Sequence, residues 1–259
     1  MSLKQSLCIA CYKPDDMDME VFCQTVADMG YPAVEIWFRD DGFHELLDAC
    51  DAAGLRLASM SGHTSLTDGL NKEGNHDRIE AELIESIDLA AEHGVPGLIC
   101  FSGNRNDGQS DEEGAEVCAA GLRRVSGYAE EKGINLNIEL LNSKVNHPGY
   151  QCDHTEWGVR VCEMVGSPRV KLLYDIYHMQ IMEGDIIRTI RENIEHIGHF
   201  HTAGNPGRHE FDDSQELNYG GICRAINETG YDLYLGHEFT PQAKNWREGL
   251  REAYEICDV

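Results

Sequence analysis

The chain has 259 residues, of which 41% are hydrophobic and 26% charged, a balance typical of a globular protein with a sizeable core. Its 21 Lys and Arg against 46 Asp and Glu give a net charge of −25. This charge argues against nucleic-acid and anionic-membrane binders, because both need basic surfaces. No apolar run is long enough to predict a transmembrane helix. The ten cysteines, without a recognisable signal peptide, indicate free thiols and a cytoplasmic location.

Short apolar runs rich in β-branched residues alternate with longer segments of helical periodicity. The runs predict eight strands, at Leu7–Ala10, Ala33–Trp37, Leu55–Met60, Gly97–Phe101, Asn135–Leu141, Val170–Ile176, Ile197–Thr202 and Tyr234–Phe239. The segments that follow them predict eight helices, at Asp18–Met29, Phe43–Ala53, His76–His93, Asp111–Lys132, Thr155–Val165, Asp185–Asn193, Glu216–Thr229 and Ala243–Ile256. Several of these helices are followed directly by glycine, as is common at helix C-termini.

Eight strand–helix units with right-handed crossovers predict an α/β fold, the (β/α)8 TIM barrel. An open doubly wound sheet is the structural alternative. Its first turn usually carries a glycine-rich phosphate loop, and the corresponding segment Cys11–Pro14 is unlike one. No linker or repeat interrupts the pattern, so residues 1–259 are expected to form one domain.

Four potential metal ligands stand at the carboxyl ends of the last four predicted strands, where the active site of such a barrel lies. They are Glu139, Asp175, His201 and Glu238, each about one strand–helix unit from the next. Three converging carboxylates would repel one another unless a cation lay between them. The set therefore predicts one divalent metal ion. Oxygen-rich ligands favour Mn²⁺, Mg²⁺ or Co²⁺, with Zn²⁺ or Fe²⁺ as alternatives.

Three further residues are candidate substrate ligands. His178 is predicted in the loop just past Asp175, His63 follows the third strand, and Arg208 lies in the loop after the seventh. Arg208 is either a counter-ion for the carboxylates or a clamp for an anionic or polyol substrate, and the second interpretation is favoured. His199 shares a strand face with His201, which indicates an interior position. The following are expected to be surface or local structural residues: His44, His76, His93, His147, His154 and His196.

The ligand set Glu139, Asp175–His178, His201 and Glu238 resembles that of the sugar isomerase/epimerase superfamily of xylose isomerase-like TIM barrels. Pro206–Glu210 followed by Glu216–Tyr219 resembles the hydroxypyruvate isomerase family. The resemblance covers essentially the whole chain and is most specific from Leu136 to Pro241. In that family the fourth metal ligand is often glutamine, whereas His201 matches the related D-tagatose 3-epimerase-like branch. The segments around Trp37 and His63 also depart from the hydroxypyruvate isomerase pattern.

The resemblance implies a metal-dependent isomerase that interconverts a small 2-hydroxy aldehyde and a hydroxy ketone through an enediolate. Glu139 and Glu238 would then be both metal ligands and the acid/base pair. The metal would polarise the carbonyl and stabilise the charge that develops on its oxygen. Return of the proton to the opposite face would instead make a ketose 3-epimerase, and that alternative stays open.

Two other classes of function are less favoured. An endonuclease IV-like apurinic-site nuclease would need a further histidine after the fourth strand, where this chain has Ser102–Asn104. A non-catalytic sugar-binding barrel would leave two glutamates suited to proton transfer without a role. The expected partner is therefore a small-molecule substrate, with no nucleic acid or membrane, and a homo-oligomer is left open.

Overall fold

The computed structural model describes residues 2–242 and 245–259, and over these residues eight parallel strands form a nearly closed barrel. Their bounds are β1 Lys4–Leu7, β2 Ala33–Glu35, β3 Arg56–Ser61, β4 Gly97–Cys100, β5 Asn135–Glu139, β6 Val170–Asp175, β7 Ile197–Thr202 and β8 Tyr234–His237. Consecutive strands pair from β2 through to β8, and β8 pairs with β1. A single parallel bridge between Cys8 and Glu35 closes the remaining gap. The predicted (β/α)8 barrel is confirmed.

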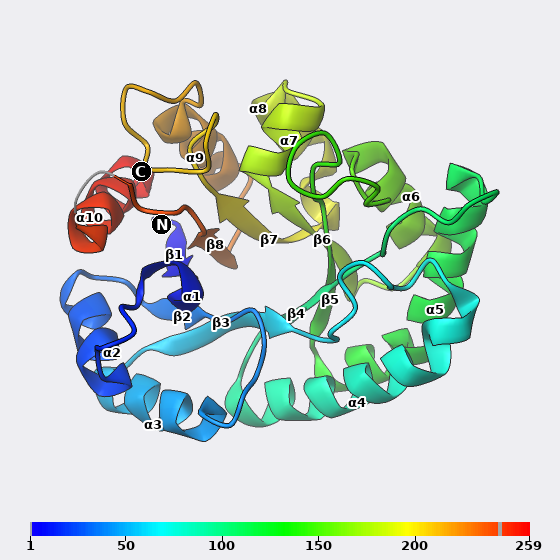
Figure 1. Cartoon of the computed structure of the whole chain (residues 1–259), viewed down its shortest axis with the longest axis horizontal. Helices are drawn as coiled ribbons and strands as arrows, with labels where there is room; N and C mark the ends of the chain where they lie inside the picture. The colour runs from blue at the N-terminus through cyan, green and yellow to red at the C-terminus, as the bar shows by residue number, and fades with distance from the viewer. Residues whose placement is uncertain (1, 243–244) are drawn as a thin grey trace.

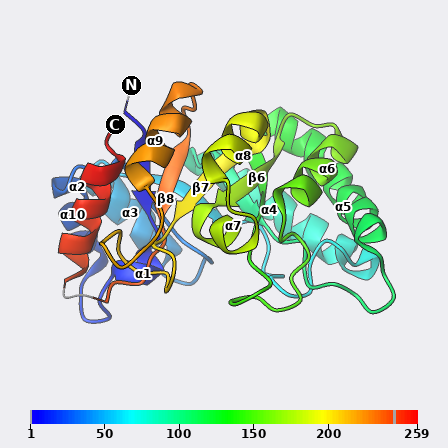
Figure 2. The same cartoon turned by 90° about the horizontal axis from the view of Figure 1, so that it is seen from above.

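Helices surround the strands in both views of the molecule, and the two ends of the described chain lie near each other (Figure 1, Figure 2). The α-helices are α1 Ile9–Tyr12, α2 Met19–Asp28, α3 Phe43–Ala53, α4 His76–His93, α5 Asp111–Lys132, α6 Thr155–Val165, α7 Ile176–Met182, α8 Ile186–Asn193, α9 Tyr219–Glu228 and α10 Trp246–Cys257. Short 3-10 turns occur at Glu73–Asn75 and Ile194–His196. Helices α3, α4, α5 and α6 have the predicted bounds, because each ends at a glycine in the left-handed conformation.

The prediction for the first strand was wrong by several residues. β1 is Lys4–Leu7, and part of the strand predicted at Leu7–Ala10 lies in helix α1. The cause is that this strand buries polar side chains on both of its faces. Ser6 Oγ donates to Glu35, and Gln5 Oε1 accepts from His237 Nε2 over 2.9 Å. A search for apolar runs therefore places this strand too late in the chain.

Helix α7 was also missed, and its presence corrects the loop position predicted for His178. The helix begins directly after β6, because the Asp175 carboxylate accepts a hydrogen bond of 2.9 Å from the backbone N–H of His178. His178 therefore lies in the first turn of α7. At the other end of the chain, Ala243 and Lys244 at the start of the last predicted helix lie outside the described residues, and α10 begins at Trp246.

The ten cysteines are free thiols, nine of them buried, as expected from their number and context. Most belong to the apolar core between the sheet and its helices. Within the described part of the chain, no helix has the length and apolarity that crossing a membrane requires.

Candidate active site

Four ionisable side chains converge at the carboxyl end of the barrel. Glu139 and Asp175 are the last residues of β5 and β6, His201 lies near the end of β7 beside Asp175 in the ladder, and Glu238 directly follows β8. All four are buried, and one ligand atom of each lies within 4.8 Å of the others. The structure thus brings together the four residues proposed as metal ligands.

The centre of this cluster is the Nδ1 atom of His201. It lies 3.5 Å from Glu139 Oε1 and 3.5 Å from Glu238 Oε2, and it is buried without a hydrogen-bond partner. Burial raises the pKa of Asp175 to about 7, with Arg208 opposing and Glu238 reinforcing the shift. Burial likewise raises the pKa of Glu139. An unpartnered imidazole nitrogen among three crowded carboxylates fits a divalent cation. Such an ion would give the nitrogen a partner and would offset the repulsion between the carboxylates.

Glu238 is held at both carboxylate oxygens. Trp37 Nε1–H donates to Oε1 over 2.5 Å, and the Arg208 guanidinium contacts Oε2. Although burial opposes it, Arg208 and His201 hold the pKa of Glu238 below its usual value. The contact between Arg208 and Glu238 is the ion pair expected of a counter-ion. Sequence reasoning did not assign a role to Trp37, although its place just past the second strand marks the same end of the barrel.

His178 presents an unpartnered donor to this cluster. Its Nδ1 accepts from the backbone N–H of Asn142 over 3.0 Å, so the neutral ring carries its proton on Nε2. Burial, followed by the charge of Arg208, lowers the pKa of His178 well below its usual value. The Nε2 atom is buried without a hydrogen-bond partner, 3.7 Å from Asp175 Oδ2. A substrate oxygen in the cluster could accept from this N–H group.

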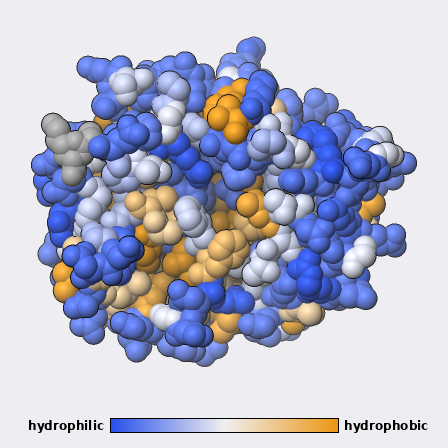
Figure 3. Space-filling model, viewed as in Figure 1, coloured by the Kyte–Doolittle hydropathy of each residue, from blue (hydrophilic) through white to orange (hydrophobic). Residues whose placement is uncertain are grey.

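A cavity of about 210 Å³ opens beside Glu139 and Glu238. Its other lining residues are Trp37, Phe38, Ser61, Leu66, Ile99, Phe101, Leu141, His147 and Arg208. Figure 3 shows apolar side chains gathered in the middle of this face, inside a hydrophilic rim. The expectation that His147 is a surface or local structural residue was wrong, because it lines the cavity and its ring centroid lies 5.3 Å from that of His178.

His63 is not among the residues that line this cavity. Its Nε2 accepts from the backbone N–H of Phe101 over 3.0 Å, and its Nδ1 lies 3.3 Å from the backbone nitrogen of Ser65. Burial lowers the pKa of His63 to about 4. The structure therefore places His63 as a support for the backbone between β3 and β4, and does not bring it together with the other predicted substrate ligands.

Glu35 is a buried acid that sequence reasoning missed. It ends β2, and its Oε2 lies 3.0 Å from the Nε2 atoms of both His199 and His201. Although burial opposes it, His199 and His201 hold the pKa of Glu35 far below its usual value. The signal in the sequence was an acid flanked by Val34 and Ile36 within a strand. The interior position expected of His199 agrees with this contact.

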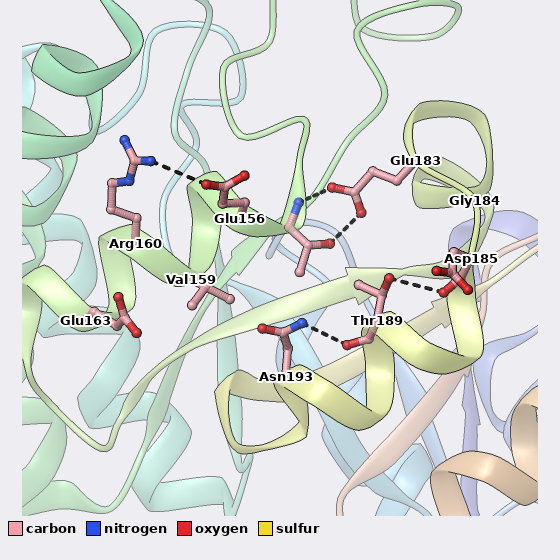
Figure 4. A pocket seen from close by; sticks show the side chains of 10 residues that line it. Glu156, Val159, Arg160, Glu163, Glu183, Gly184, Asp185, Thr189 and Asn193 are labelled. Atoms are coloured by element: carbon pink, nitrogen blue, oxygen red, sulfur yellow. Dashed lines mark hydrogen bonds and ion pairs between the residues drawn. The ribbon is translucent and has the colours of Figure 1, made fainter.

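A larger pocket, of about 420 Å³, lies between α6 and α8 and shares no lining residue with the cavity (Figure 4). Three of its acids, Glu156, Glu183 and Asp185, have local structural partners. Glu183 accepts from the backbone N–H and the hydroxyl of Thr155 at the start of α6, and Arg160 pairs with Glu156 over 3.6 Å. This pocket therefore adds nothing to the site described above.

The chain matches known proteins over most of its length. Residues 23–256 match the model of the family described as xylose isomerase-like TIM barrel. Hydroxypyruvate isomerase of Escherichia coli (strain K12) is 30% identical over 69% of this chain and 68% of its own. A 2-oxo-tetronate isomerase of Cupriavidus necator is 37% identical over 44% of each chain.

The solved structure of an AP endonuclease, family 2, from Brucella melitensis superimposes with a TM-score of 0.85 over the full length of both chains. Its sequence is 21% identical to this one. At that identity the likeness shows the barrel fold alone.

Proposed function

The chain belongs to the xylose isomerase-like TIM barrel family and is an isomerase, and we propose that it acts on a small hydroxy-carbonyl or sugar-like substrate with the help of one divalent metal ion. Glu139, Asp175, His201 and Glu238 would hold the ion. The observation that carries this proposal is the buried, unpartnered Nδ1 of His201 among three carboxylates. A cation is the simplest group that satisfies all four side chains together. Mn²⁺, Mg²⁺ or Co²⁺ suits the ligand set best, with Zn²⁺ or Fe²⁺ as alternatives.

Glu139 and Glu238 are placed to move the proton. Glu139 ends β5 and Glu238 follows β8, and an oxygen of each lies 3.5 Å from His201 Nδ1, so a substrate bound at this cluster would have two carboxylates within reach. A divalent ion held by these residues would supply Lewis-acid chemistry toward a substrate carbonyl. One glutamate would take the proton from the carbon next to the carbonyl and return it to the neighbouring carbon. The contacts from Trp37 and Arg208 keep the Glu238 carboxylate oriented.

Two side chains are suited to hold the substrate oxygens. The buried Nε2–H of His178 lacks a partner, and Arg208 lines the cavity beside Glu238. The cavity of about 210 Å³ suits a compound of a few carbon atoms. Hydroxypyruvate and 2-oxo-tetronates, the substrates in the names of the two relatives, are therefore the first compounds to assay.

Proton transfer is tested by incubating substrate with the enzyme in D₂O. An enediolate route incorporates deuterium at the carbon next to the carbonyl, whereas a hydride shift leaves it unlabelled. Glu139→Gln and Glu238→Gln retain an oxygen ligand but remove the base, so each should lower turnover by about 10²–10⁴-fold. Glu156→Gln makes the same chemical change on the exposed face of α6 and serves as the control. Retention of more than about a tenth of the activity in both site variants would exclude either glutamate as the base.

Epimerisation at carbon 3 of a ketose is the second candidate function. The presence of two carboxylates from different strands, Glu139 and Glu238, at one cluster favours it, because one could remove a proton and the other return it to the opposite face. Product analysis distinguishes the two reactions. An isomerase moves the carbonyl, and an epimerase inverts one carbon and leaves the carbonyl in place.

A further inference from the structure

The side chain of Glu35 crosses the inside of the barrel and contacts two histidines that lie three strands away. It ends β2, whereas His199 and His201 belong to β7, and β1 and β8 lie between. Two features of the intervening strands permit the crossing. Ser6 of β1 donates its hydroxyl to Glu35 Oε1, and a Cβ atom on Gly236 of β8 would overlap that same oxygen. Ser6 and Gly236 are paired in the ladder, so they lie side by side beneath the carboxylate.

The Glu35 carboxylate has two imidazole partners on one oxygen. Its Oε2 lies 3.0 Å from the Nε2 atoms of both His199 and His201. An ionised carboxylate only accepts hydrogen bonds, so both Nε2 atoms must carry their protons. A neutral His201 ring then has its lone pair on Nδ1, the atom that faces Glu139 and Glu238.

We propose that Glu35 is a positioning residue that holds the His201 imidazole in the Nε2-protonated form and in its observed orientation, so that the Nδ1 lone pair faces the proposed metal position. A metal ligand must present a lone pair, and the hydrogen bond on the far ring nitrogen commonly decides which nitrogen is free. Within the described residues, Glu35 is the one hydrogen-bond partner of His201 Nε2. This inference rests on the metal site of the proposed function.

Two substitutions separate the charge of Glu35 from its hydrogen bonds. Glu35→Gln keeps an acceptor of the same shape without the charge, and we expect Mn²⁺ binding to weaken about tenfold. Glu35→Leu removes the acceptor altogether, and we expect a loss of about 100-fold. Both affinities are measured by isothermal titration calorimetry on the full chain. If the leucine variant fails to fold, the glutamine variant still decides the question.

His199→Gln is the matched control, because it also removes one buried imidazole contact from Glu35 but leaves that of His201 in place. We expect its Mn²⁺ affinity to change by less than about threefold, although its melting temperature falls as in Glu35→Gln. Equal losses of affinity in Glu35→Gln and His199→Gln would show that general damage to the barrel interior is responsible, and would overturn the positioning role.

The tautomer of His201 gives a readout that a merely structural role would not change. In metal-free protein brought to a pH at which the ring is neutral, long-range ¹H–¹⁵N spectra should show the Nε2–H form in the wild type. Glu35→Leu should show a substantial Nδ1–H population, and Glu35→Gln should restore the wild-type form. An unchanged tautomer in Glu35→Leu would contradict the proposal.

Metal stoichiometry distinguishes the failure of this inference from the failure of the proposed function. If the wild type binds no divalent ion, the proposed site is wrong, and the role of Glu35 fails with it. If the wild type binds one ion and Glu35→Gln binds it equally well, only the inference about Glu35 fails. If the wild type binds two ions and Glu35→Leu binds one, Glu35 is itself a ligand, together with His199 and His201, which also overturns the positioning role.

Discussion

Arg208 is in contact with Glu238 and at the same time lies over the ring of Tyr177, 5.8 Å from its centroid. Its backbone has a φ of 61°, and the backbone N–H of Thr240 donates to its carbonyl over 2.7 Å. The arginine therefore lies between a catalytic candidate and the ring of Tyr177 in α7. This position allows it to act both as a counter-ion and as a substrate ligand.

Replacement of Arg208 separates these two roles. Arg208→Ala should lower kcat/KM by about 10- to 100-fold, because a hydrogen bond to a charged group contributes about 1.5–3 kcal/mol. The melting temperature should change little, since a loop side chain does not support the core. Arg208→Lys retains the charge without the planar fork and should recover part of the activity. Wild-type kinetics combined with a markedly lower melting temperature would identify Arg208 as a counter-ion only.

Removal of the metal should abolish activity. Chelator treatment followed by Mn²⁺, Mg²⁺ or Co²⁺ should restore it, and saturation at about 100 times Kd should stabilise the folded state by about 2.7 kcal/mol. Thermal unfolding with and without the ion measures this difference. Asp175→Ala should lose the ion-dependent stabilisation, because it removes one of the proposed ligands. Full activity in thoroughly metal-stripped wild type would refute the metal requirement.

His147 should contribute to substrate affinity. His147→Phe keeps an aromatic ring against His178 but removes the polar atoms that line the cavity, so KM should rise about tenfold with little change in melting temperature. His154→Phe is the control, since this histidine is half-exposed, pairs with Asp153 and lies outside the cavity. Identical steady-state kinetics in the two variants would show that His147 has no role in substrate binding.

His63 should make the protein less stable in mild acid. Its pKa is about 4 when folded, against an ordinary value near 6.5, so the unfolded chain binds more protons between these two pH values. The neutral His63 ring therefore contributes fully to the free energy of unfolding above about pH 6.5. This contribution, about 3 kcal/mol in all, is lost as the pH falls from there through 4.

Urea unfolding of metal-free protein across this pH range measures the effect. His63→Gln keeps an acceptor for the N–H of Phe101 but does not titrate, so its stability should fall less steeply with acid. Parallel pH profiles for the wild type and His63→Gln would contradict this account.

The meeting of Glu139, Asp175, His201 and Glu238 could be predicted from sequence, because neighbouring parallel strands of a barrel bring their carboxyl ends to one rim. Glu35 and Trp37 could not be placed in the same way. Glu35 acts through the barrel interior, across strands that are distant in sequence, and an acid in an apolar run has no periodic signature. His147 depends on a loop that folds back, where Tyr150 donates its hydroxyl to the carbonyl of Glu139 over 3.1 Å.

The missed helix α7 has a similar origin. Seven residues are too few for helical periodicity to emerge, and the helix forms because the Asp175 side chain caps it. The same carboxylate is a proposed metal ligand, so its second oxygen is the one that remains available. The helical turn that places His178 beside the carboxylate cluster is thus determined by the side chain of a strand residue.

β1 and β2 are joined by a single bridge between Cys8 and Glu35, whereas the other neighbouring strands pair over longer stretches. The residue that closes the wall there through its backbone is also the one whose carboxylate extends to His201. A change that separates β1 from β2 at this junction would therefore act on the same residue that contacts His199 and His201. The backbone contact that completes the ring of strands and the side-chain contact that orients His201 therefore belong to one residue, Glu35.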